Sequence, residues 1–245
     1  MNHYWPAALM LATAALSTSY TATAQTSEAA PYGSPVADET VWLHAVLDQF
    51  EGRLGASDVL RWEGEAWTGT DTDRLWLKSE GEFENSKVFD GQQEAFYDTP
   101  LSTWFDLQVG LRYDLDSQPG RVWAAAGIEG LSQYFFRMSA TAYASNTGHY
   151  AAKFFGTYDL LLTQRLILQP EAEVNIYSKS DPARLVVSGV SDLDTGLRLR
   201  YEITRKFAPY IGVTYERRFA ARSQLAARGQ TPEQLRFAVG LRSWF

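Results

Sequence analysis

The stretch from Tyr158 to Tyr177 carries the clearest pattern in the chain, because apolar and polar side chains alternate along most of it. After a break at Thr163-Gln164, one parity holds Leu166, Leu168, Ala172, Val174 and Ile176, and the other holds Arg165, Gln169, Glu171, Glu173 and Asn175. A period of two predicts a β-strand, since successive strand side chains point to opposite faces. The run is longer than the roughly five or six residues of an ordinary strand and about as long as a tilted strand that crosses a bilayer.

The stretch from Asp192 to Ile203 repeats the pattern. Its apolar parity is Leu193, Leu197, Leu199, Tyr201 and Ile203, and its polar parity is Asp192, Asp194, Arg198, Arg200 and Glu202. Lipid against one face and a polar lumen against the other would produce this asymmetry. The alternative is a soluble sandwich or lipocalin-type barrel, which is apolar inside and usually has shorter strands. The lengths favour a membrane barrel.

Composition fits a single barrel domain of 245 residues, with an aromatic content of 14% that is typical of barrels with aromatic girdles at the membrane interfaces. The chain has no Cys, which excludes disulfides and thiolate metal sites. A net charge of −7 argues against a nucleic-acid partner, since phosphate binding needs a basic face. No run of about eighteen apolar residues follows the N-terminus, which excludes a membrane-spanning helix.

The N-terminus is typical of an exported protein. Residues 1–24 predict a signal peptide, with an apolar region from Pro6 to Ala15 and a cleavage motif, Ala22-Thr23-Ala24, before Gln25. It departs from the usual form because no Lys or Arg precedes Arg53. Residues 25–40 lack periodicity and predict a flexible leader. Residues 41–245 are then the barrel.

About twelve strands are expected, which makes the fold an all-β, antiparallel, up-and-down transmembrane barrel. The candidates are Trp42–Gly55, Val59–Gly69, Arg74–Phe83, Gln92–Thr99, Trp104–Leu115, Val122–Leu131, Tyr134–Ser145, His149–Leu160, Leu166–Tyr177, Asp192–Ile203, Phe207–Phe219 and Glu233–Phe245. A short helix fits Trp42–Gly55 equally well by pattern, but an even strand count requires a strand there.

Connections alternate between short turns and longer polar loops such as Ser178–Gly189 and Ala220–Pro232. Short turns on the periplasmic side and long loops outside are the outer-membrane arrangement. The terminal aromatic residue, Phe245, is typical of the same class. Pro170 and Pro209 each remove a ladder hydrogen bond within a strand, and we expect bulges at both.

Several stretches resemble the copper resistance protein B family of outer-membrane proteins, from about His44 to Phe245. They are WEGEAWTG (62–69), RLWLKSEGE (74–82), WFDLQVGLRYD (104–114), Tyr158–Gln169, DPAR (181–184), GLRLRYE (196–202) and FAPYIGV (207–213). The resemblance implies an outer-membrane barrel that binds copper or moves it across the envelope in copper homeostasis. It implies lipid and copper ions as partners, together with a periplasmic copper protein of the same resistance system.

One departure from the family bears on the metal. Many members carry a Met- and His-rich N-terminal segment suited to Cu(I), whereas the expected mature chain has Met138 as its one Met and His44 and His149 as its two His. The remaining candidate ligands suit Cu(II) better: they are His44, Glu51, Glu63, Glu65, Glu80 and Glu82. The alternative is that these acids pair with Arg53, Lys78, Arg198 and Arg200 and fill a narrow lumen. His149 is interpreted as a solvated loop residue.

We do not expect an enzyme. Lipases and proteases occur on such barrels, but neither His44 nor His149 lies beside a recognisable nucleophile motif. The main alternative to a copper protein is a small general channel or a structural barrel without metal preference, in which long lumenal side chains leave a narrow or plugged pore.

Overall fold

The computed structural model describes residues 40–84, 87–115, 120–227 and 231–245. The expected signal peptide, and the expected leader except Thr40, lie outside these ranges. The strands are β1 (Trp42–Leu54), β2 (Val59–Gly69), β3 (Arg74–Glu84), β4 (Lys87–Pro100), β5 (Phe105–Asp114), β6 (Arg121–Ser132), β7 (Phe136–Ser145), β8 (Tyr150–Thr157), β9 (Leu160–Leu161), β10 (Leu166–Tyr177), β11 (Gly189–Tyr201), β12 (Phe207–Arg218) and β13 (Glu233–Trp244). A short helix, α1 (Arg222–Ala227), and 3₁₀ turns at Gln133–Phe135 and Pro182–Arg184 complete the fold.

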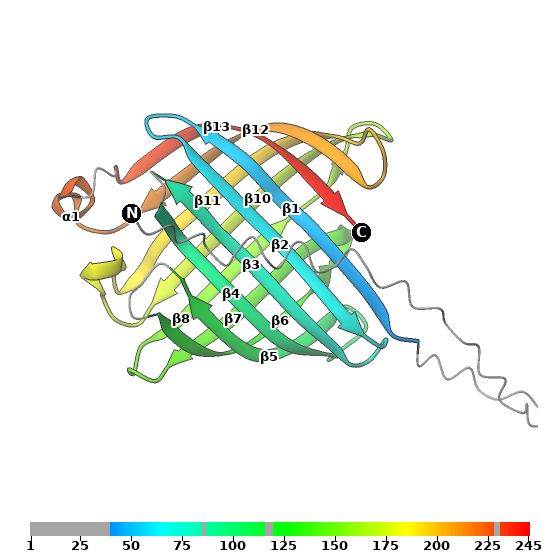
Figure 1. The fold of residues 1–245 in the computed structure, drawn as a ribbon, viewed down its shortest axis with the longest axis horizontal. Coiled ribbons are helices and arrows are strands. Elements are labelled where there is room, and N and C mark those ends of the chain that lie inside the picture. The colour runs from blue at the N-terminus through cyan, green and yellow to red at the C-terminus, as the bar shows by residue number, and fades with distance from the viewer. Residues whose placement is uncertain (1–39, 85–86, 116–119, 228–230) are drawn as a thin grey trace, which may run out of the picture. The chain divides into compact units, whose positions relative to one another are not determined.

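The strands form one closed antiparallel barrel (Figure 1). Strands that follow one another in sequence pair, except that β8 and β9 both pair with β10, and β13 pairs with β1 to close the ring. The two-residue β9 continues β8 along the same edge of β10, so the ring is 12-stranded. This confirms the expected architecture, and it confirms Trp42–Leu54 as the strand that an even count demanded. None of the helices that the structure describes is long and apolar enough to cross a membrane.

The two faces of the barrel have opposite chemistry, as the alternation predicted. On β11, Leu197 and Tyr201 are 44% and 48% exposed, whereas Arg198 and Arg200 are 1% and 2% exposed inside the ring. β13 repeats the pattern with outward Phe237 and inward Arg236. Apolar residues outside and charges inside invert the soluble arrangement, which excludes a soluble barrel and fits lipid around the wall.

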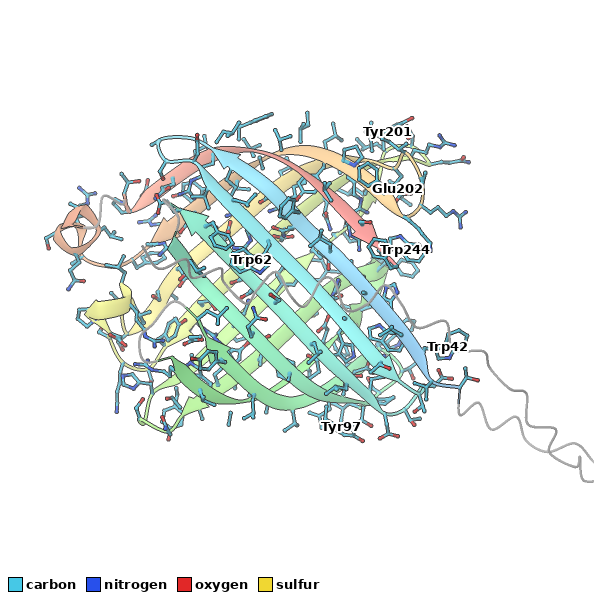
Figure 2. All side chains as sticks on the ribbon, viewed as in Figure 1. Trp42, Trp62, Tyr97, Tyr201, Glu202 and Trp244 are labelled. Carbon is cyan, nitrogen blue, oxygen red and sulfur yellow. The ribbon has the colours of Figure 1, made fainter. Side chains whose placement is uncertain are left out.

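The barrel has a turn end and a loop end. At the turn end lie the short connections that follow β2, β4, β6, β9 and β11, together with the C-terminus (Figure 1). The labelled aromatic residues Trp42, Tyr97, Tyr201 and Trp244 lie at this end (Figure 2). At the loop end, the longer connections after β10 and β12 pack together through Leu185 and Leu225, and α1 belongs to this cluster.

The expected bulges at the prolines are wrong. Pro170 keeps regular register with Leu197 on β11, and its other edge faces the break between β8 and β9, where the Tyr158 N–H donates to its carbonyl at 3.2 Å. Pro209 lies just beyond the last β11–β12 pair, Arg200 with Tyr210. Each proline thus sits where the ladder ends on one of its two edges, and a missing N–H at such an edge costs little.

Bulges occur instead beside acidic residues. Register slips by one residue at Asp48 on β1 and at Asp90 on β4, and Asp90 takes a left-handed backbone with φ 47°. A bulge re-aims side chains relative to the pleat. The bulge on β1 turns both Asp48 and Gln49 inward, where they contact Arg242 and Glu171.

Candidate functional site

The lumen is filled by charged side chains that contact one another. Glu51 is fully buried and accepts hydrogen bonds from Arg53 Nε at 2.7 Å and Arg198 Nε at 2.9 Å. Arg53 also reaches Glu82 and Asp194, at 3.2 and 2.8 Å. Buried charges persist only when they are paired and hydrogen-bonded, so these contacts hold the interior of the wall together.

Among the described residues, three close ion pairs cross the lumen between nearly opposite walls, and Arg137 on β7 also lies 3.9 Å from Asp48 on the opposite strand, β1. Arg137 on β7 meets Glu65 on β2 at 2.9 Å, Lys153 on β8 meets Glu80 on β3 at 2.5 Å, and Arg218 on β12 meets Asp90 on β4 at 2.5 Å. The two strands of each close pair lie five places apart around the ring. We call these three contacts the cross-lumen pairs. They divide the interior rather than line a single open pore.

Cavities lie between these contacts, and three that the described residues line have volumes of about 30, 50 and 60 Å³, each enough for a few waters or one ion. The loop-end chamber is lined by Asp90, Gly91, Gln92, Arg112, Asp114, Arg121, Trp123, His149, Tyr177, Lys179, Asp181, Arg184 and Val186. The middle chamber is lined by Arg61, Glu80, Glu82, Asp90, Gln92, Glu173, Asn175, Tyr177, Asp192, Leu193, Asp194, Glu216 and Arg218. The turn-end chamber is lined by Asp48, Glu63, Gly64, Glu65, Lys78, Ser79, Glu80, Glu94, Glu129, Arg137, Ser139, Thr141, Tyr143, Lys153, Phe155 and Glu173.

The chambers follow one another and share walls. Asp90, Gln92 and Tyr177 line both the loop-end and the middle chamber, and Glu80 and Glu173 line both the middle and the turn-end chamber. These five residues therefore lie where neighbouring chambers meet.

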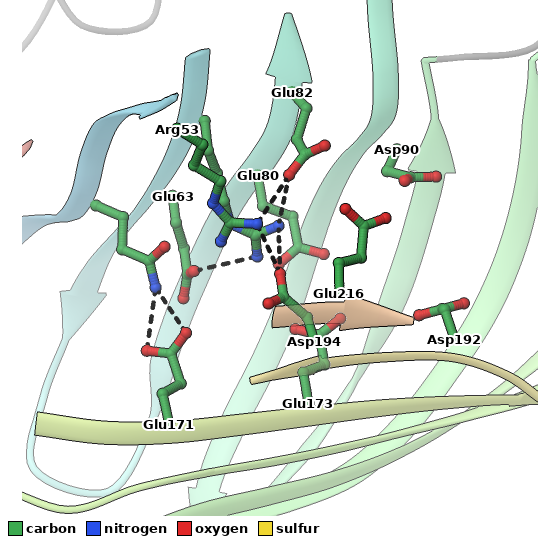
Figure 3. Close-up of polar contacts among 12 residues, drawn as sticks. Arg53, Glu63, Glu80, Glu82, Asp90, Glu171, Glu173, Asp192, Asp194 and Glu216 are labelled. Carbon is green, nitrogen blue, oxygen red and sulfur yellow. Dashed lines mark hydrogen bonds and ion pairs between the residues drawn. The ribbon is translucent and has the colours of Figure 1, made fainter. Parts of the chain in front are cut away.

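The middle chamber is the most acidic part of the lumen. Seven carboxylates line it and only two arginines, Arg61 and Arg218 (Figure 3 shows the surrounding acids). Arg61 lies 3.6 Å from both Glu63 and Glu82 and 3.7 Å from Asp194. The loop-end chamber differs, because Arg112, Arg121, Lys179 and Arg184 outnumber its three aspartates there. Cations are favoured in the middle of the lumen over anions.

Four of the five acids proposed from the sequence line the two acidic chambers, and Glu80 lines both. Glu63, Glu65 and Glu80 line the turn-end chamber, and Glu80 and Glu82 line the middle chamber. Glu51 lines no chamber, because Arg53 and Arg198 take both of its oxygens. Pairing of this kind is what the alternative sequence interpretation expected.

His44 lies apart from the acids, near the turn end. Its ring centroid is 6.1 Å from that of Trp67 and 5.7 Å from that of Trp244, and it lines none of the three chambers. Arg74 and Lys206 place their cations over the Trp67 and Trp244 rings, at 5.8 and 5.3 Å. Over the described ranges, no group of three His, Asp or Glu side chains is close enough together to hold a metal ion.

Sequence reasoning missed several lining residues and one pairing. Lys153 is a lone charge in the strand YAAKFFGT, and an inward cation on such a strand is the signal that would have singled it out. The alternative interpretation paired Arg200 with the candidate glutamates, but Arg200 binds Asp159 at 2.9 Å and Gln169 at 3.2 Å. On the neighbouring strand β10, Glu171 is bound by Arg198 and Glu173 by Lys153.

The chain is similar to the members of one known family over most of its length. A family model described as Copper resistance protein B precursor matches residues 41–245. The chain is 41% identical over 215 residues to Copper resistance protein B of Escherichia coli, covering 87% of this chain and 73% of the relative. It is 40% identical, with the same coverage, to a Copper resistance protein B homolog of Pseudomonas syringae pv. tomato. The solved NanC porin superposes with a TM-score of 0.55 at 12% identity, covering 82% of this chain and 99% of the porin, which shows a likeness of fold alone.

Proposed function

The chain belongs to the copper resistance protein B family of the outer membrane, and from that premise we propose that its lumen binds copper ions and passes them across the membrane. A role in copper resistance follows from the family itself. The observation that supports passage is the series of chambers with shared acidic walls, because a cation that leaves one chamber meets carboxylates of the next. The family and the porin-like barrel favour a non-enzymatic role.

The ligands favour Cu(II) as the ion. Carboxylate and amide oxygens line the middle and turn-end chambers, and such oxygens suit Cu(II) better than Cu(I). The described thioether, Met138, alternates with lumenal Arg137 along β7 and so falls on the lipid-facing parity.

His44 and its aromatic neighbours at the turn end form the surface on which we propose that a periplasmic copper protein docks. A photoreactive crosslinker at Trp42, 53% exposed, would capture such a partner in cells.

Deleting the gene should make cells sensitive to copper and leave zinc tolerance unchanged. The wild-type gene should restore growth, and a Glu63→Gln/Glu65→Gln variant should restore it only in part, because it removes two carboxylates of the turn-end chamber. Growth across a copper series, with zinc in parallel, is the measurement. Glu233→Gln, at an exposed rim position, is the matched control and should complement fully. Equal sensitivity to both metals would support a general channel or structural barrel instead.

Trypsin added to intact cells should cut after Arg222 and spare Arg184. Arg222 is exposed in the long loop after β12, whereas the Arg184 side chain is 14% exposed and binds Asp114 at 2.7 Å. Arg228, the other basic residue of this loop, lies outside the described residues. Mass spectrometry of the fragments checks the site, and Arg222→Gln should abolish that cut. Cleavage after Lys206 in intact cells would put the turn end outside and reverse the orientation.

A further inference from the structure

Lys153 crosses the lumen where two chambers meet. Its ammonium Nζ lies 2.5 Å from Glu80 Oε1 and 3.4 Å from Glu173 Oε2, and its side chain is 11% exposed. Both glutamates line the middle chamber and the turn-end chamber. A cation that moves between these chambers therefore meets Glu80 and Glu173, two carboxylates that already bind the ammonium of Lys153.

Lys153 is the most replaceable member of the cross-lumen pairs. Arg137 is fixed by both oxygens of Glu65 and by Glu129, and Arg218 is held by Asp90 and Glu216. An arginine fork is rigid and suited to paired oxygens, whereas a lysine is a point charge on a flexible stem. A divalent ion also carries twice the charge of the ammonium that it would displace.

Gln92 is an independent sign that a cation belongs beside Glu80, on the side of the middle chamber that meets the loop-end chamber. It is 8% exposed and lines the middle chamber, and its carbonyl Oε1 is buried without a hydrogen-bond partner. It is the direct cross-strand partner of Glu80. A buried acceptor left unsatisfied is costly, and a cation bound beside Glu80 would satisfy it.

We infer that Lys153 is a built-in counter-ion that closes the junction, and that a divalent cation crossing the lumen takes its place between Glu80 and Glu173 with Gln92 Oε1 alongside. This rests on the proposed function and names its selective step.

Purified full-length protein in planar bilayers tests the inference. Lys153→Gln should raise K⁺ conductance, shift the reversal potential in a KCl gradient toward cation selectivity, and let CuCl₂ block the K⁺ current at about tenfold lower concentration, since a competing unit charge is removed. The Lys153→Arg variant keeps the positive charge, so its K⁺ conductance should equal that of the wild type. Arg165→Gln removes a charge from an exposed turn and should change none of these values.

The double variant Lys153→Gln/Glu80→Gln separates the site from a simple loss of charge. It lacks one of the two carboxylates, so the CuCl₂ block gained by Lys153→Gln should disappear. Retention of the gain in the double variant, or no gain in Lys153→Gln, would overturn the inference. Heat-modifiable mobility on electrophoresis checks assembly. If Lys153→Gln does not assemble, Glu80→Gln is compared with wild type, and an undiminished CuCl₂ block there would likewise overturn it.

Copper tolerance separates this inference from the function on which it rests. If the deletion strain is not copper-sensitive but the bilayer results hold, the junction admits divalent cations and the copper role fails. If copper sensitivity is found but the Lys153 variants behave as wild type, the copper role stands and the counter-ion step fails.

Discussion

Glu51→Leu should lower the free energy of unfolding by about 3–5 kcal/mol, because it leaves two buried guanidiniums without the carboxylate that they share. Glu51 is 0% exposed, and Arg53 and Arg198, 0% and 1% exposed, both donate to it. Each arginine keeps other partners, Asp194 for Arg53 and Glu171 for Arg198, but the two cations lose the negative charge between them. Urea titration of the barrel in phospholipid vesicles is the measurement.

The same substitution at the barrel rim is the matched control. Glu233 lies 3.8 Å from Arg217, and both side chains are about half exposed. Exposed pairs contribute about 0–1 kcal/mol, so Glu233→Leu should have little effect. Similar losses in both variants would mean that water solvates the Glu51 cluster. A stable Glu51→Leu barrel with lost copper tolerance would instead return Glu51 to the list of metal ligands.

The sequence was sufficient to predict the wall of the barrel, because the alternation within each strand shows which side chains face lipid and which face the lumen. Alternation from Leu197 to Tyr201 predicted which side chains face lipid, and their exposure agrees. β1 was ambiguous by its own pattern, and only the closure of an antiparallel ring with an even strand count identified it. The wall can therefore be predicted from residues adjacent in sequence together with one property of the whole barrel, its even strand count.

The interior could not be predicted in the same way, because alternation says that a side chain points inward but not how far along the axis it lies or what it meets. Lys153 and Glu80 are separated by 73 positions in sequence and touch only because strand tilt and register bring those walls level. The imidazole of His44 is a suitable metal ligand by residue type, but it lies between Trp67 and Trp244 at the turn end, away from the acids. Asp48 and Asp90 are aimed by bulges that no proline marks.

Leu197→Arg should cost about 2–4 kcal/mol of folding free energy in bilayers, because it places a charge on the lipid face well inside the membrane. Leu197 is 44% exposed on that face, and it lies further from the interfacial Tyr201 than Leu199 does along β11. The cost of a lipid-facing arginine falls to about 0–1 kcal/mol near an interface. The predicted order of destabilisation is therefore Leu197→Arg, then Leu199→Arg, then Tyr201→Arg.

Arg200→Leu is the reciprocal exchange, and it should be mild. Arg200 is 2% exposed inside the ring, but its acidic partner, Asp159, has a side chain 48% exposed and can be solvated when the arginine is lost. Urea titrations of all four variants in the same vesicles give the comparison. Equal costs at Leu197, Leu199 and Tyr201 would contradict the assigned depth of β11. A tolerated Leu197→Arg together with a stabilising Arg200→Leu would invert the two faces. The graded loss expected here requires both the outward parity of the leucines and a bilayer whose centre lies on the loop-end side of Tyr201.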